Sequence, residues 1–143
     1  MLTLSYLQDI LSGIMPPPNI IESEAGYDAI IELIQTKGLE RVIIFEPPEG
    51  GVFKVQPGGL DDTACSIWVM RMVGSDDSRR AIQRQCRKTL KAIIATFLKY
   101  RHDAPLQGWR MDSMPYSIRN AGANYTGYEM TIYFSDETKL SGQ

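Results

Sequence analysis

The chain has 143 residues, enough for one domain with a single hydrophobic core and too few for two domains of ordinary size. Its 43% hydrophobic and 22% charged residues exclude a disordered or collagen-like protein. A mean hydropathy of -0.19, without an apolar run near the ~20 residues that a spanning helix needs, excludes a transmembrane protein. Two cysteines, Cys65 and Cys86, form no disulfide framework or zinc site, and Met1–Ile14 lacks the basic start of a secretory signal. We therefore expect a reduced, cytoplasmic chain.

Charge is unevenly divided along the chain. The net charge is -2, but residues 1–62 carry ten acids and three bases, whereas residues 63–143 carry seven acids and twelve bases. The two parts therefore have net charges of -7 and +5. Eight bases fall within residues 79–101, with no acid among them. Such a block can bind nucleic acid, meet an acidic surface, or form a solvated helix face that pairs with acids elsewhere in the fold.

The first part of the chain predicts two helices. Apolar residues of the first recur at helical spacing: Leu4, Leu7, Ile10, Leu11 and Ile14. Thr3 is placed to cap this helix, and the proline run Met15–Asn19 ends it. A second helix is expected from about Glu24 to Lys37, before Gly38.

Strand patterns begin at Arg41. The segment Arg41–Glu46 is rich in β-branched residues, and Val52–Val55 is predicted to be the returning strand of a hairpin, followed by a loop over Gln56–Asp62. Ala64–Val73 is the longest predicted strand. Its two faces are both apolar: Ile67 and Val69 on one, Trp68, Met70 and Met72 on the other. One face is expected to lie under a helix, and the other against a second layer or a neighbouring subunit.

A long amphipathic helix follows, and it dominates the second half of the chain. Ser75 is the predicted cap, with Asp76 and Asp77 in the first turn. Its apolar residues step by three and four positions: Ile82, Cys86, Leu90, Ile93, Phe97 and Tyr100. This stripe predicts a helix of about six to seven turns.

Strands return after the helix. They are predicted around Trp109–Asp112, at Tyr116–Arg119 and across Tyr128–Ser135, with a turn at Asn120–Asn124. The expected fold class is α+β: a mostly antiparallel sheet with one long amphipathic helix packed on it, plus two N-terminal helices. We expect a single domain over residues 1–143, with a helical segment at 1–38, a core at 39–136 and a frayed tail at 137–143.

Candidate chemical groups have local explanations as well as functional ones. His102 and Asp103 could act as a general base, but a histidine just after a helix is also favoured by the helix dipole. The pairs Asp61–Asp62 and Asp76–Asp77 could hold magnesium as in a nuclease, yet a turn and a helix N-terminus explain them. We therefore assign no catalytic residue, no cofactor and no metal.

The basic residues of the long helix gather on one side: Arg80, Arg84, Arg87, Lys88 and Lys91. They could follow the phosphates of a nucleic acid. Binders of single strands usually add aromatic residues that stack on bases, and here Phe97 and Tyr100 belong to the apolar stripe. Binding of nucleic acid by residues 79–101 is therefore possible but not favoured.

The order of elements resembles the small head–tail junction proteins of tailed bacteriophages, in particular tail-terminator and tail-completion proteins. The residues that carry the resemblance are the strand Ser66–Val73, the helix Asp76–Tyr100 and the strand Tyr128–Phe134, within residues 40–136. The helical segment Met1–Gly38 departs from the smallest members. The resemblance implies a non-enzymatic structural protein of a phage or prophage tail, without a cofactor, that forms a ring, commonly a hexamer.

The same resemblance implies other tail or neck proteins as partners, no membrane, and assembly in the cytoplasm of a bacterial host before incorporation into the virion. The charge division predicts a head-to-tail interface in which Arg84, Arg87 and Lys91 meet the acidic half of the next subunit. The apolar part of this interface is expected on Trp68, Met70 and Met72. Two alternatives stay open: a nucleic-acid-binding domain that uses helix 79–101, and a small metal-dependent nuclease that uses the aspartate pairs.

Overall fold

A computed structural model of the chain describes residues 2–14, 19–22, 31–32, 34–36, 41–47, 51–54, 60–122 and 124–137. The first helix, α1 (Leu4–Leu11), has the predicted cap, because the Thr3 hydroxyl accepts a hydrogen bond from the Tyr6 backbone N–H at 3.2 Å. It ends at Leu11, short of the predicted Ile14. Residues 31–32 and 34–36 are helical, and the rest of the predicted second helix lies outside the described residues.

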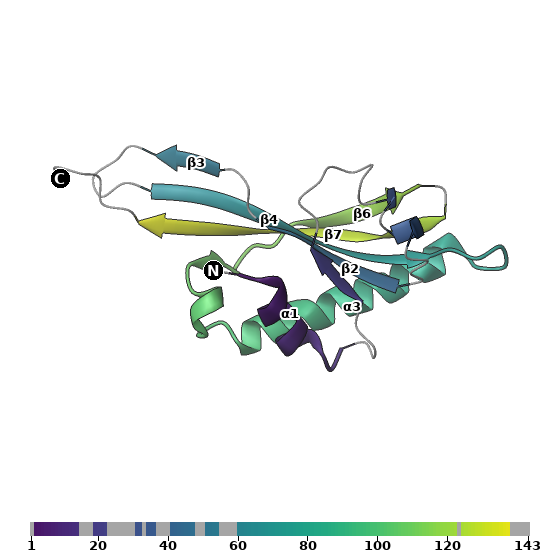
Figure 1. The fold of residues 1–143 in the computed structure, drawn as a ribbon, viewed down its shortest axis with the longest axis horizontal. Coiled ribbons are helices and arrows are strands. Elements are labelled where there is room, and N and C mark those ends of the chain that lie inside the picture. The colour runs from purple at the N-terminus through teal and green to yellow at the C-terminus, as the bar shows by residue number, and fades with distance from the viewer. Residues whose placement is uncertain are drawn as a thin grey trace.

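In the described part of the chain, seven strands form one mixed sheet. They are β1 (Ile20–Glu22), β2 (Arg41–Glu46), β3 (Gly51–Lys54), β4 (Leu60–Met72), β5 (Trp109–Arg110), β6 (Tyr116–Ala121) and β7 (Tyr125–Glu137). The order is β1-β2-β4-β7-β5, with β3 beside β4 and β6 beside β7 (Figure 1). β1 and β2 are parallel, and the other described pairs are antiparallel. The predicted α+β fold with a mostly antiparallel sheet is confirmed.

The partner of β3 corrects the predicted hairpin. β3 pairs with the start of β4, not with β2, and β2 pairs with the later part of β4. β4 has 13 residues, so two short strands can lie end to end along one of its edges. The ladder also includes Leu60–Asp62, which the sequence places in a loop. These residues are extended because β3 and β7 both supply backbone partners for them.

The long helix α3 (Arg79–Lys99) begins later than predicted. Its cap is Ser78, whose hydroxyl accepts from the Ala81 N–H at 3.4 Å. Ser75 is therefore not the cap, and Asp76 and Asp77 precede the helix. The Asp77 carboxylate accepts instead from the Gly74 N–H at 2.8 Å, which closes a turn before α3.

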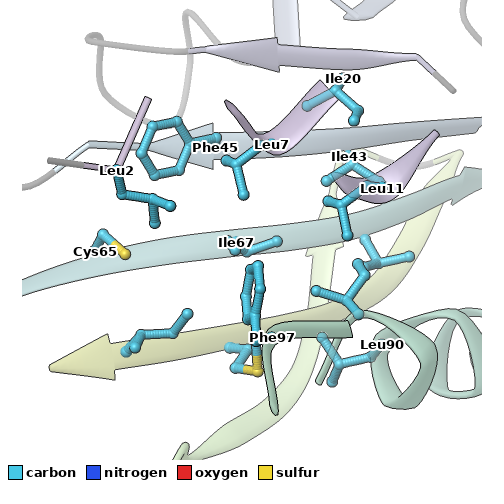
Figure 2. Packing of buried hydrophobic residues seen from close by; sticks show 14 of the residues in the cluster. Leu2, Leu7, Leu11, Ile20, Ile43, Phe45, Cys65, Ile67, Leu90 and Phe97 are labelled. Atoms are coloured by element: carbon cyan, nitrogen blue, oxygen red, sulfur yellow. The ribbon is translucent and has the colours of Figure 1, made fainter. Parts of the chain in front are cut away.

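Helices α1 and α3 cover the same face of the sheet (Figure 1). The predicted stripe of α3 is confirmed within the helix, where Ile82, Cys86, Leu90, Ile93 and Phe97 are buried. Its last predicted member, Tyr100, is the C-cap residue and is only half-buried. They belong to a cluster that joins α1 to the sheet through Leu7, Leu11, Ile43, Phe45 and Ile67, among others. Figure 2 shows the packing of part of this cluster, including Leu7 and Leu11 of α1, Ile67 of β4 and Phe97 of α3. This cluster is the larger of the two cores.

The other face of the sheet is also covered within the chain. A second cluster contains Ile34 of the helical residues 34–36, together with Val42, Ile44, Trp68, Met70, Ala121 and Tyr125 of the strands. Trp68 and Met70 are only 2% and 1% exposed. The expectation that they lie on an uncovered face is therefore wrong, because the N-terminal helical segment packs on them. Met72 remains 38% exposed.

The end of the described chain contains more strand than predicted. β6 continues through Ala121, where a turn is expected, and the chain turns at Gly122, whose φ is +64°. β7 begins at Tyr125 and runs to Glu137, so it is longer than the predicted strand Tyr128–Ser135 and includes Glu137, the first residue of the predicted frayed tail. Residues 138–143 lie outside the described residues. A short 3₁₀ helix, η1 (Ala104–Leu106), joins α3 to β5.

Cys65 and Cys86 are free thiols in the larger core, as predicted. Burial raises the pKa of Cys65 to about 12. Burial also raises the pKa of Cys86 to about 11, although the charges of Arg71 and Arg41 partly oppose the rise. Both thiols are therefore protonated and shielded at neutral pH.

We expect iodoacetamide to label neither cysteine within minutes in the native protein at pH 8, because the thiolate is the reactive form and both sulfurs are buried. Denatured protein provides the control, because Cys65 and Cys86 should both be labelled within minutes once they are exposed. Mass spectrometry measures the label. A bond between Cys65 and Cys86, or rapid native labelling, contradicts the expectation.

Candidate interaction surface

The solvent side of α3 carries five basic residues, here called the basic face: Arg80, Arg84, Arg87, Lys88 and Lys91. All five are exposed, because the apolar stripe of the helix turns toward the sheet. Among the described residues, no carboxylate forms an ion pair with Arg80, Arg84, Lys88 or Lys91. The described part of the fold therefore leaves these four charges available to another molecule.

Strand β6 lies beside the basic face and is exposed over its first five residues. Tyr116 and Ile118 are 44% and 50% exposed. Alternation places them on the same face of the sheet as α3, where Arg87 donates a hydrogen bond to the Tyr116 hydroxyl at 3.0 Å. The Arg87 guanidinium also lies 5.8 Å from the centre of the Tyr116 ring. An aromatic residue and a branched apolar residue thus adjoin the basic charges.

The outer edge of β6 has no strand partner among the described residues, since β6 pairs with β7 alone. The charged side chain of β6, Arg119, is engaged on the opposite face of the sheet. It forms an ion pair with Glu129 at 3.0 Å and lies 5.1 Å from the centre of the Trp68 ring. We call Tyr116, Ile118 and the outer backbone of β6 the β6 edge. The exposed edge is not among the predicted sites, although Tyr116 and Ile118 alternate with polar residues in the sequence.

The structure does not join His102 and Asp103 into a catalytic pair. The Tyr6 hydroxyl donates a hydrogen bond to the Asp103 carboxylate at 2.9 Å, and His102 Nε2 accepts from Arg101 at 3.4 Å. Burial, followed by the hydrogen bond to Asp103, raises the pKa of Tyr6 to about 12. Asp103 therefore links α1 to the segment after α3.

The two aspartate pairs lie at opposite ends of β4. Asp62 precedes Met72 by ten residues, which corresponds to about 33 Å of extended strand. Asp76 and Asp77 follow beyond that end. In the described ranges, no three side chains of His, Cys, Asp or Glu gather as metal ligands. The geometry therefore does not bring the four aspartates together as the nuclease alternative requires.

A pocket of about 190 Å³ lies on the other flank of α3, next to β2. Arg41, Arg71, Gln85 and Thr89 supply its polar lining, and Cys86 lies at its apolar side. These residues share no local pattern in the sequence, so they are not among the predicted sites. Arg41 and Arg71 are 30 positions apart, and the register of β2 against β4 is what places them opposite each other.

Comparison with known proteins adds no relative. No protein-family model matches the chain, and no curated protein matches it significantly. Within the described residues, no helix combines the length and the apolar character needed to cross a membrane.

Proposed function

We propose that the chain is a structural subunit that joins copies of itself into a ring, of the kind that tail-terminator and head–tail junction proteins form in tailed phages. The observation that supports this proposal is the β6 edge, which is exposed, unpaired among the described strands and adjacent to the basic face. The resemblance in element order supplies the phage context. A hexamer is the expected stoichiometry.

An exposed edge strand is a place where another chain can add. Natural proteins usually protect such edges with lysines, prolines, bulges or a covering helix. β6 has no lysine and no proline within its bounds, although Pro115 precedes it. Its charge, Arg119, is directed to Glu129 on the opposite face. The edge is therefore suited to contact with another subunit through backbone hydrogen bonds and the side chains of Tyr116 and Ile118.

The charge division favours a head-to-tail contact. A ring joins two different patches of each subunit, so a basic patch can meet an acidic one around the circle. The basic face lies in the half with net charge +5, and exposed acids of the other half include Asp9, Glu22 and Glu32. Such charges would mainly direct association and register. A symmetric dimer through the basic face would instead bring like charges together.

Apolar contact must come from residues other than Trp68 and Met70, which are buried in the subunit. Tyr116 and Ile118 replace them in the proposed interface, and Met72, at 38% exposed, stays in it. Burial of such side chains stabilises an interface by roughly 25 cal/mol per Å² before the entropic cost of association.

We expect the protein to form a discrete ring, and Ile118→Lys to lower its mass to that of smaller species or monomers. The lysine places a charge where the neighbour must pack, without touching either core. Reversal of Arg84, Arg87 and Lys91 to Glu should likewise lower the mass. Added salt should lower the mass of the wild-type assembly more than that of the variant, because salt screens the charges that the variant lacks. Light scattering coupled to gel filtration measures the mass, and circular dichroism checks the fold.

Leu98→Lys is the matched control, because Leu98 is an exposed apolar residue of α3 at 40% exposure, at the end of the helix away from β6. Its mass should equal that of the wild type. A wild-type monomer at all protein concentrations, or normal assembly of both the Ile118 and the triple variant, contradicts the proposal.

One observation favours a second candidate, the binding of nucleic acid. In the sequence, the aromatic residues near the bases of α3 belong to its apolar stripe, but the fold places Tyr116 beside Arg87. Stacking on an aromatic ring next to cationic groups is typical of single-strand binders. Fluorescence anisotropy with a labelled oligonucleotide tests this candidate. Binding that weakens steeply with salt, and that both Tyr116→Ala and the triple variant reduce, would support it.

A further inference from the structure

Two arginines face each other across β2 and β4. Arg41 and Arg71 are direct partners in the antiparallel register, so their Cβ atoms are about 4.5–5.5 Å apart. Both side chains line the pocket beside α3. Like charges directly opposite each other in a sheet are destabilising. Repulsion between the two arginines therefore destabilises the fold, and a negatively charged ligand between them would remove this repulsion.

No acid compensates this pair in the described structure. Within residues 60–122 and the other described ranges, neither Arg41 nor Arg71 forms an ion pair with a carboxylate, and the pocket lining contains no Asp or Glu. Arg71 is half-buried, so water screens its charge less than at an open surface. The charges of Arg71 and Arg41 also act on the buried Cys86 thiol and oppose the rise of its pKa. The positive potential thus extends into the pocket.

Helix α3 adds polar groups to the same pocket. Gln85 and Thr89 lie one turn apart, so both project from one flank of the helix. The Thr89 hydroxyl donates to the Gln85 carbonyl at 3.3 Å, whereas the Gln85 side-chain amide has no hydrogen-bond partner among the described residues. Two guanidinium groups and one amide therefore supply N–H donors around a common space. The lining offers a surplus of donors, which suits an acceptor-rich anion.

The volume limits the size of the ligand. The pocket holds about 190 Å³, below the roughly 300–1,000 Å³ of pockets for drug-sized ligands. An ion or a single small group fits this space better than a whole nucleotide. Arg41 is exposed, so the pocket is reachable from solvent.

We propose that this pocket binds one phosphate group, held by the guanidinium groups of Arg41 and Arg71 and by the amide of Gln85. A free phosphate near charge -2 balances both guanidinium charges, whereas a phosphodiester of a nucleic acid carries a single negative charge and balances one of them. In both cases the phosphate oxygens accept the paired N–H groups that arginine presents. The group can come from free inorganic phosphate or from the backbone of a nucleic acid. The proposal does not depend on ring formation, because all the residues that line the pocket come from one subunit.

The experiment measures thermal unfolding of the full chain with increasing inorganic phosphate, against sodium chloride at equal ionic strength. A ligand that binds the native state raises the melting temperature with its concentration, and chloride serves as the baseline. We expect a phosphate-specific rise that Arg71→Met and Arg41→Met each remove, through a loss of affinity of about tenfold or more. In chloride alone neither variant should be less stable than the wild type, because each removes one of two repelling charges.

Arg110→Met is the matched control, since Arg110 is an exposed arginine of β5 outside both the pocket and the basic face. It should keep the full phosphate response. An equal rise in chloride, a response retained by Arg71→Met, or an equal loss in Arg110→Met overturns the proposal. A larger rise with acetate than with phosphate at equal ionic strength also overturns it, because the pocket would then select a carboxylate.

A second arm identifies the source of the phosphate. Titration of a short thymidine oligonucleotide into wild type and Arg71→Met, with inorganic phosphate as competitor, distinguishes the two. Weaker oligonucleotide binding by Arg71→Met, together with competition by phosphate, supports a nucleic-acid backbone as the ligand. Unchanged oligonucleotide binding beside a phosphate-specific thermal response supports the free ion.

Discussion

Replacement of Phe97 by alanine is expected to lower the free energy of unfolding by about 3–5 kcal/mol. The Phe97 side chain is fully buried, and it belongs to the core cluster that holds α3 and α1 to the sheet. Figure 2 shows its ring directed from α3 toward Ile67 of β4. Truncation removes most of a large apolar side chain and leaves a cavity that rigid strands cannot close. The cost therefore includes both lost burial and lost packing.

Urea unfolding followed by circular dichroism measures this effect. The slope of the unfolding free energy against urea concentration should be the same for wild type and variant, because unfolding exposes the same surface in both. Leu98→Ala is the matched control, because Leu98 is the next residue of the same helix but is 40% exposed. Its stability should change by less than about 1 kcal/mol. A loss below about 1 kcal/mol for Phe97→Ala would show that this face of α3 is not core.

Gly127→Ala is expected to be at least as damaging, for a different physical reason. Gly127 lies in β7 opposite Met70 of β4, in the longest strand pair of the sheet. A Cβ at Gly127 would lie 1.8 Å from the Val69 carbonyl oxygen and 2.9 Å from its carbon. These are backbone atoms, so relief requires the two strands to separate. We expect a loss above about 3 kcal/mol, beyond the usual 1–3 kcal/mol for overpacking.

The control for this variant is Gly13→Ala. A Cβ at Gly13 meets no atom within 4 Å, and its φ is not positive. Its effect should stay within about 1 kcal/mol, and it can be stabilising because alanine restricts the unfolded chain. Hydrogen exchange of β4 and β7 amides gives a second readout for Gly127→Ala. A well-folded variant with native protection in both strands contradicts the expected clash.

The sequence determined those parts of the fold that depend on neighbours along the chain. The cap at Thr3, the stripe of α3 and the alternation around Met130 and Ile132 all involve residues within a few positions of one another. Helical periodicity and strand alternation are visible in such windows. For the same reason the composition of the basic face was readable from the spacing of its arginines and lysines.

Local signals also explain the errors at element ends. Ser75 and Ser78 are both serines and are equally suitable as caps by residue type, so local sequence does not distinguish them. In the structure Ser78 caps α3. The glycine at position 127 weakens a strand pattern, so β7 was predicted to begin at Tyr128 when it begins at Tyr125. The structure retains Gly127 because β4 approaches too closely for any side chain.

Only the tertiary structure decided which segments meet. β3 pairs with β4 because the 13 residues of β4 are long enough for two strands, β2 and β3, to pair with one edge end to end. Trp68 and Met70, which we expected in an interface, are instead covered by the helical residues around Ile34. The β6 edge and the facing arginines, Arg41 and Arg71, likewise arise from register between strands far apart in the chain. Strand pairing is non-local, and a shift of one residue would move every side chain to the opposite face. Periodicity predicts the faces of a strand, whereas the partners of each face depend on how the whole chain packs.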